Sequence, residues 1–301
     1  MGLLRRRRVM VNLASPAPPD GRRRRMLIKF SGRTAAYVAL TVIALAALVP
    51  MVYAISTSLK PSGQELTIPV RWIPSPVEWG NYLRIFQVAP LLTFFKNTMI
   101  ITLVTLVGNV MVSALVAYAF ARLRFPGRDA LFVVVLSTIM LPYVVTLIPQ
   151  FVLFRNVGLV NTLWPLIIPS MFGHPIYIFL LRQFFKSIPV EVEDAARLDG
   201  AGFLRTFWSI ALPLARPGLA TVLILSVLTH WNDFIAPLVY LNTEDKWTLS
   251  LAVNLFQGDF RINYNLMMAY AAVMTVPVVL VFFAFQKYFV RGITLSATAG
   301  R

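Results

Sequence analysis

Long apolar runs, separated by short polar segments, fill most of this chain. A transmembrane helix needs about 20 mostly apolar residues to cross roughly 30 Å of hydrocarbon, and each run is long enough to do so. The runs cover residues 35–56, 97–121, 130–154, 162–184, 218–241 and 266–289. The pattern predicts an all-α polytopic membrane protein with six transmembrane helices.

The composition points to the same class. Hydrophobic residues make up 58% of the chain and charged residues 13%, against about 45 to 50% and about 25% in an ordinary soluble domain. Little material remains for a separate soluble domain. We expect a basic, disordered N-terminal extension over residues 1–34, one transmembrane domain over residues 35–292, and a short tail over residues 293–301.

The distribution of basic residues predicts the orientation of these helices. Lys and Arg in short flanking loops stay on the cytoplasmic side of the membrane. If the N-terminus is cytoplasmic, 21 of the 28 basic residues fall on that side, whereas the acidic residues divide almost evenly. Both termini are therefore expected to be cytoplasmic, together with the polar segment at residues 186–216.

The N-terminal extension accounts for much of the net charge of +16. Its two arginine clusters, Arg5 to Arg8 and Arg22 to Arg25, could suggest nucleic-acid binding. Their place before the first apolar run favours a topology signal that contacts anionic lipid, and no nucleic-acid partner is expected. The first run could also be a cleaved signal peptide, but it is too long and starts too far from the N-terminus for a typical one.

The sequence lacks residues that several kinds of chemistry require. The chain has no cysteine, which excludes disulfides and thiolate metal sites. Its two histidines, His174 and His230, lie in different apolar runs, so no metal site is expected. The runs contain no paired acids and no nucleophile with a base, which argues against an intramembrane enzyme.

Helix-breaking residues interrupt the third and fourth runs. Pro142 and Pro149 lie in the third run. The fourth contains Pro165, Pro169, Gly173 and Pro175. Backbone carbonyls freed by such residues must be satisfied inside protein or in a water-lined cavity. These helices are either kinked within a packed bundle or border a pathway that bends as it opens.

The fifth run contains a polar cluster, Thr229-His230-Trp231-Asn232-Asp233. An acid within a membrane span is costly unless it faces protein or water, so it is a functional candidate by default. The cluster could form a hydrogen bond between helices, or it could line a translocation pathway. Asp233 could also serve as the coupling group of a proton- or sodium-coupled carrier, although the runs show no internal repeat.

A polar island separates the fourth and fifth runs, and its residues favour a docking element that contacts a partner. Pro189 can open a helix, and acids follow in its first turns, where the helix dipole favours negative charge. Gly200 can end that helix in a left-handed conformation. A second short helix should follow, with Phe203, Phe207 and Ile210 on one stripe that suits the membrane surface.

The spacing within this island resembles the EAA loop of the membrane subunits of bacterial ABC importers. The matching positions are Asp194, Ala195, Ala196, Gly200, Ile210, Leu212 and Pro213. Asp194 departs from the family, which usually has Glu there. Ala117-Tyr118-Ala119-Phe120-Ala121-Arg122, Trp231-Asn232-Asp233-Phe234 and further segments resemble the smaller permease of carbohydrate importers of the maltose and oligosaccharide type, over about residues 35 to 292.

The resemblance implies a type I ABC importer permease fold in the bacterial plasma (inner) membrane. In that family the loop, here the coupling loop (residues 186–216), docks on a cytoplasmic ATPase subunit. The residues that would carry this contact are Glu193, Asp194, Ala195, Ala196, Asp199, Gly200, Ala201, Ile210, Leu212 and Pro213. The chain has no GxxxxGK[ST] stretch, so the resemblance implies a non-catalytic subunit whose partners bind ATP and Mg.

The resemblance also implies the remaining partners. They are a second homologous permease, two ATP-binding subunits and an extracytoplasmic sugar-binding protein. The loop at residues 242–265 would reach into that binding protein through Asn254, Gln257 and Gly258. In such pairs the companion permease often makes most sugar contacts, so Trp231, Asn232 and Asp233 are expected to be pathway residues.

Overall fold

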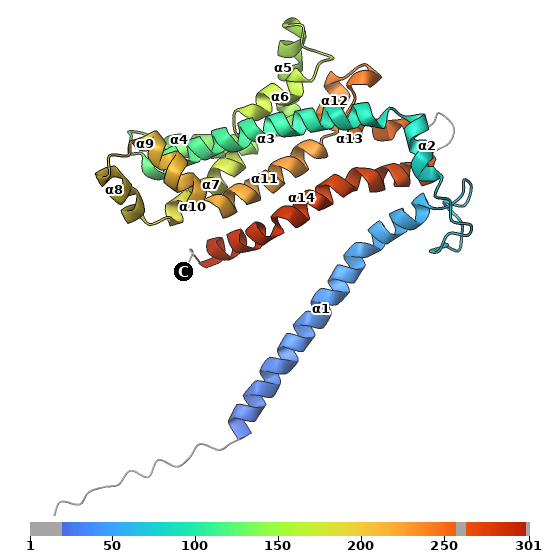
Figure 1. Ribbon diagram of the computed structural model, residues 1–301, viewed down its shortest axis with the longest axis horizontal. Coiled ribbons are helices and arrows are strands. Elements are labelled where there is room, and N and C mark those ends of the chain that lie inside the picture. Colours follow the sequence, from blue (N-terminus) through green and yellow to red (C-terminus); the bar gives the residue numbers. More distant parts are fainter. Residues whose placement is uncertain (1–19, 257–262, 299–301) are drawn as a thin grey trace, which may run out of the picture. The chain divides into compact units, whose positions relative to one another are not determined.

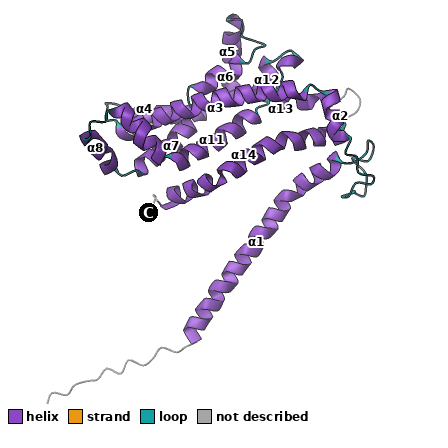
Figure 2. Cartoon of the chain, in the orientation of Figure 1, coloured by secondary structure: helices purple, strands orange, loops and turns teal. Residues whose placement is uncertain are grey.

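The computed structural model describes the backbone of residues 20–256 and 263–298, and the side chains of residues 33–256 and 263–287. Within these ranges the chain is helical and has no strand (Figure 2). It divides into two units, Met1–Tyr53 and Ala54–Arg301. Gln257 and Gly258, most of the N-terminal extension and the last residues of the tail lie outside the described part.

The first unit is formed by most of helix α1 (Asp20–Ser58). Its membrane-spanning part runs from Arg33 to Ser58, two residues beyond the predicted run at each end. The helix is apolar on all sides there, as expected for a span that faces lipid or other apolar helices.

The second unit is built around α3 (Leu91–Arg122), a 32-residue helix without proline. It packs against α6 (Trp164–Met171), α7 (Pro175–Ser187) and α11 (Arg216–Trp231). The last long helix, α14 (Tyr264–Thr298), packs against α11 and against α2 (Asn81–Val88), the short helix before α3 (Figure 1).

Three of the remaining predicted spans contain breaks. The fourth is divided at residues 172–174, where Gly173 has a φ of +91°. The fifth consists of α11 and α12 (Ile235–Tyr240), separated by residues 232–234. The third, over residues 130–154, consists of α4 (Arg128–Ser137), the turn η1 (Thr138–Met140) and α5 (Tyr143–Asn156).

The break in the third span lies at Pro142, one of the two helix-breaking residues noted there in the sequence. α4 and α5 are bent by 92° relative to each other. Among the described residues, five helices are therefore long enough and apolar enough to span a membrane, or up to six if the bent pair is one span. Pro142 has no N–H to donate and disfavours helical geometry at Leu141. Leu141 is accordingly extended, with ψ of 115°.

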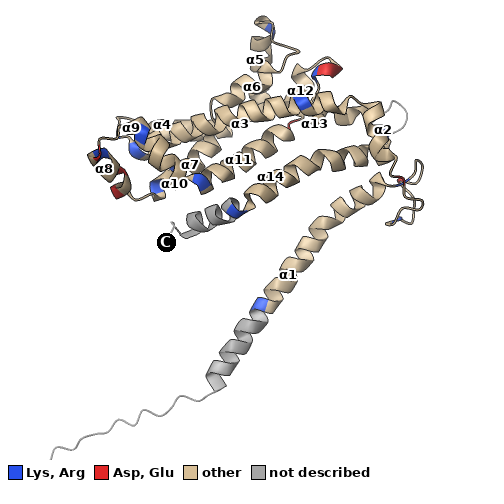
Figure 3. Cartoon of the chain, in the orientation of Figure 1, with Lys and Arg blue, Asp and Glu red and all other residues tan. Residues whose placement is uncertain are grey.

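The short helices between α7 and α11 form one end of this unit. They are α8 (Val190–Leu198), α9 (Phe203–Thr206), the π-helical turn η2 (Phe207–Ala211) and α10 (Leu212–Leu214). Charged side chains gather at this end, whereas the middle of the bundle is nearly free of them (Figure 3). The cluster of buried apolar residues beneath it is centred on Tyr118, Phe185 and Phe207.

Candidate functional site

The coupling loop begins with a helix whose start was predicted correctly. Pro189 is extended, with ψ of 135°, and α8 starts at the next residue. Glu191 and Glu193 fall in its first turn, where the partial positive charge of the helix N-terminus favours acids.

Gly200 ends this helix in the predicted left-handed conformation, with φ of +80°. The N–H of Gly200 donates to the Arg197 carbonyl at 3.0 Å, and the N–H of Ala201 donates to the Ala196 carbonyl at 2.9 Å. This pair of bonds forms a Schellman motif, which satisfies carbonyls at the helix end. A side chain at Gly200 would meet nothing within 4 Å, so this corner of the loop is open.

The second half of the coupling loop packs differently from the prediction. The stripe expected on the membrane surface faces the bundle instead: Phe207 is 1% exposed and packs with Phe203 around Tyr118 of α3. Ile210, Leu212 and Pro213 are half-buried. Burial in the bundle removes more apolar surface from water than an interfacial position would, and it fixes the loop to α3.

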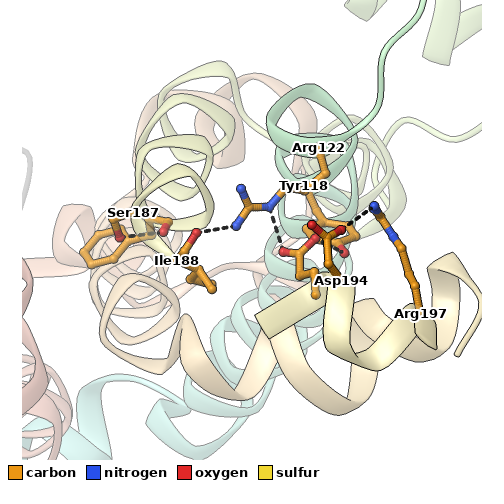
Figure 4. A network of polar contacts seen from close by, with 8 residues as sticks. Tyr118, Arg122, Ser187, Ile188, Asp194 and Arg197 are labelled. Carbon is orange, nitrogen blue, oxygen red and sulfur yellow. Dashed lines mark hydrogen bonds and ion pairs between the residues drawn. The ribbon is translucent and has the colours of Figure 1, made fainter. Parts of the chain in front are cut away.

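Glu193 fastens α8 to the end of α3 (Figure 4). Its carboxylate has no exposed surface and accepts hydrogen bonds from Tyr118 Oη at 3.1 Å and from Arg122 Nε at 2.7 Å. Arg122 Nη2 also donates to the Ile188 carbonyl at 2.6 Å. Glu193 was predicted to contact a partner, but its side chain instead holds the coupling loop to α3.

The opposite face of α8 is exposed. Asp194, Ala195, Asp199 and Gly200 lie on it, whereas Ala196 is buried and Ala201 half-buried. Asp194 pairs with Arg197 at 3.1 Å, but both side chains are more than half exposed, so this ion pair contributes little stability and both groups are free to contact a partner.

Leu198 is the residue of this face that sequence reasoning missed. It is 90% exposed, the highest value of any large apolar side chain in the coupling loop. An apolar side chain left on an otherwise polar helix end is the signal that could have identified it. Tyr118 and Arg122 were also missed as site residues, because nothing local connects them to a loop some 70 residues later in the chain.

A second candidate site is a cavity of about 380 Å³ inside the bundle. The breaks in the spans surround it: Pro165, Pro169 and Gly173 contribute to its wall, and Tyr143 follows the bend at Pro142. Its polar lining comes from five helices or the turns beside them and consists of Asn109, Tyr143, Gln150, Ser170, His174, Tyr177, Thr229, His230 and Asp233.

Thr229 and His230 of the predicted polar cluster line this cavity, but only one of the three predicted pathway residues does. Asp233 does, just beyond the end of α11. Trp231 is buried and donates from Nε1 to the Met274 carbonyl at 3.1 Å, which joins α11 to α14. Asn232 is exposed, and its amide donates to the Leu228 carbonyl of its own helix at 2.9 Å.

The 242–265 loop is held to the bundle by side chains of the preceding spans. Asn97 Nδ2 of α3 donates to the carbonyls of Asp245 at 2.9 Å and Trp247 at 3.0 Å. Asn161 Oδ1 accepts from the backbone N–H groups of Asn242 and Thr243. Asn254 lies half-buried in the short turn η4 (Val253–Phe256).

Together, a bundle of spanning helices, a polar cavity among its broken spans and a docking loop at one end define a polytopic membrane transport protein. Comparisons with known proteins agree. The model of the family described as "binding-protein-dependent transport system inner membrane component" matches residues 109–295. The chain belongs to this family.

Relatives and solved structures extend the match beyond that region. The arabinooligosaccharides transport system permease protein AraQ of Halalkalibacterium halodurans is 35% identical, with 86% of this chain and 93% of the relative covered. The trehalose transport system permease protein SugB of Mycobacterium tuberculosis is 36% identical, covering 84% and 93%. A bacterial ABC transporter involved in the import of alginate has a chain with a TM-score of 0.74 and 27% identity, covering 87% and 97%.

These findings confirm the predicted resemblance and the ABC importer permease fold. They also support a transport subunit over the ion-coupled carrier that was considered for Asp233, and over an intramembrane enzyme. Members of this family are membrane components of transport systems, so the chain is a multi-pass inner-membrane protein without catalytic activity of its own.

Proposed function

We propose that this chain is the transmembrane permease subunit of an ATP-driven carbohydrate importer. The family is binding-protein-dependent, and its similar relatives are named for arabinooligosaccharides, diacetylchitobiose and trehalose. These names share a chemical class, the saccharides, but no single sugar. The chain would form half of the pathway through the membrane.

The observation that carries the proposal is the two-sided use of α8. Its inward face is tied to α3 through Glu193 and Arg122, whereas Asp194, Ala195 and Leu198 on the outward face are exposed. Because one face of α8 is fixed to α3 and the other is exposed, a partner that displaces α8 would also displace α3. We assign this face, with Asp199, Gly200 and Ala201, to contact with an ATPase subunit.

The remaining parts of the assembly follow from this assignment. A second homologous permease would complete the pathway, and two cytoplasmic ATPase subunits would bind ATP and Mg. An extracytoplasmic binding protein would deliver the sugar to the 242–265 loop, with Asn254, Gln257 and Gly258 as contacts. The coupling loop and both termini would then be cytoplasmic, as the excess of Lys and Arg at that end supports (Figure 3).

A bulky residue on the outward face of α8 tests the proposal. In proteoliposomes that contain the whole complex, with its binding protein added, Ala195→Trp should abolish ATP-driven sugar uptake and reduce the amount of ATPase that co-purifies. Ala195 is exposed, so the chain itself has room for the new ring.

Ala130→Trp is the matched control. Ala130 is another exposed alanine, near the start of α4 and outside the coupling loop, and tryptophan is well tolerated at membrane interfaces. This variant should keep both uptake and the ATPase. Normal uptake by Ala195→Trp would refute the docking assignment.

A further inference from the structure

Among the described residues, the wall of the cavity inside the bundle contains one carboxylate, that of Asp233, and no Lys or Arg. Its two histidines are His174 and His230. Basic residues of the surrounding helices, such as Arg155 and Arg182, are not part of the wall. The described Asp, Glu, Lys and Arg residues therefore give the wall a negative formal charge.

In the part of the chain whose side chains are described, no Lys or Arg pairs with Asp233. Asp233 Oδ1 accepts a hydrogen bond from the backbone N–H of Ala236 at 3.3 Å, and the N–H of Ile235 also faces the carboxylate. Within residues 33–256 and 263–287, no ion pair joins Asp233 to a Lys or Arg. The two backbone dipoles leave lone pairs of the carboxylate facing the cavity.

The other titratable groups of the wall do not supply a fixed positive charge. His174 Nδ1 accepts from the N–H of Ile176, and His230 Nδ1 lies 2.7 Å from the Ser226 carbonyl. Imidazole and phenol side chains do not carry the permanent positive charge of a Lys or Arg side chain. The hydroxyl, amide and ring groups that remain can hydrogen-bond a polar ligand.

We infer that this cavity is a subsite for uncharged saccharide units, and that Asp233 makes it select against anionic ones. The inference rests on the proposed function. A carboxylate accepts charge-assisted hydrogen bonds from sugar hydroxyl groups. It repels a uronate or sulfonate, and a cavity with low-dielectric walls strengthens that repulsion.

Membership of the family does not decide this charge class. The relatives include the sulfoquinovosyl glycerol permease SmoH of Agrobacterium fabrum, at 29% identity, beside permeases named for trehalose and raffinose. A similar solved structure belongs to an importer of the acidic polysaccharide alginate. The charge of the pathway must therefore be set by particular side chains, and Asp233 is the one Asp, Glu, Lys or Arg among the described residues of the cavity wall.

The absence of cysteine allows a direct measurement of this selectivity. Ser170 lines the cavity and is half-buried in α6. In the purified whole complex at pH 8, the thiol of Ser170→Cys would be modified with a trimethylammonium-ethyl or a sulfonatoethyl methanethiosulfonate. The rate of each is read by mass spectrometry of this chain and divided by its rate with free cysteine.

The cationic reagent should react roughly ten-fold faster than the anionic one after this correction. Adding Asp233→Asn should bring the two rates together. Adding Glu78→Gln, which removes an acid outside the cavity, should leave the ratio unchanged. ATP-driven uptake, measured separately, reports on the proposed function.

Equal corrected rates in the Ser170→Cys complex would overturn the inference, as would a ratio that survives Asp233→Asn. Modification by neither reagent would overturn it as well, because the cavity would then not admit polar solutes. In each of these cases intact ATP-driven uptake would leave the proposed function standing.

Discussion

At the scale of single residues, two consecutive acids of the coupling loop have different roles, one facing the bundle and one facing solvent. Glu193 and Asp194 are consecutive acids on α8, but the first side chain has no exposed surface and the second is 55% exposed. Successive positions of a helix point about 100° apart, so neighbouring acids can face the bundle and a partner. The inward acid is held by two hydrogen bonds, and the outward one is free to exchange partners.

Replacing Glu193 should loosen the coupling loop. Glu193→Gln leaves the largely buried guanidinium of Arg122 without its counter-charge, and breaking such a pair costs about 3 to 5 kcal/mol. The melting temperature of the purified complex should fall, and combining it with Arg122→Met should restore part of the loss. Glu191→Gln, on the exposed side of the same turn, is the control. An equal, small fall in both single variants would argue against a fastening role.

At the scale of elements, breaks in the spans bring polar groups to the middle of the bundle. The 92° bend between α4 and α5 places Tyr143 and Gln150 in the cavity wall. The gap after α11 does the same for Asp233. The breaks also free backbone groups, which must be satisfied inside protein or by water in a cavity of this kind.

Pro142→Ala should open the bend between α4 and α5. With spin labels at Leu131→Cys and Val152→Cys, an unbroken helix would separate the two backbones by about 32 Å, and a right-angle bend by roughly 22 Å. Pulsed electron resonance should report a longer distance in Pro142→Ala than in the parent pair. Pro149→Ala, within α5, should not change it. An unchanged distance in Pro142→Ala would mean that packing, not the proline, makes the bend.

At the scale of the whole molecule, charge asymmetry predicts which end meets the ATPase. In intact cells, a membrane-impermeant maleimide should label Glu244→Cys in the 242–265 loop but not Leu198→Cys in the coupling loop. Both sites are exposed, so reagent access depends on the side of the membrane. In cells that express the membrane subunits without the ATPase, so that the outward face of α8 is uncovered, both should react after the membrane is permeabilised. Labelling of Leu198→Cys from outside would invert the topology and remove the coupling loop from the ATPase side.

Local chemistry determined how much of this could be predicted. Pro189 and Gly200 fix the ends of α8 through their own backbone preferences, so their roles follow from sequence. Glu193 could not be assigned in the same way, because its partners Tyr118 and Arg122 are 75 and 71 residues away. Pro142 is compatible with a kink or a full break, and only packing decides between them. Asp233 lies beyond the end of α11, where helical spacing no longer gives side-chain direction.

The continuity of α3 has a mechanical consequence. Asn97 near one end of this helix holds the 242–265 loop, and Arg122 at the other end holds α8. The two anchors are separated by about 38 Å of helix, and no proline interrupts it. If such a rod tilts about its middle, its ends swing in opposite directions. The coupling loop and the 242–265 loop, which we assign to the ATPase and to the binding protein, therefore cannot be displaced independently.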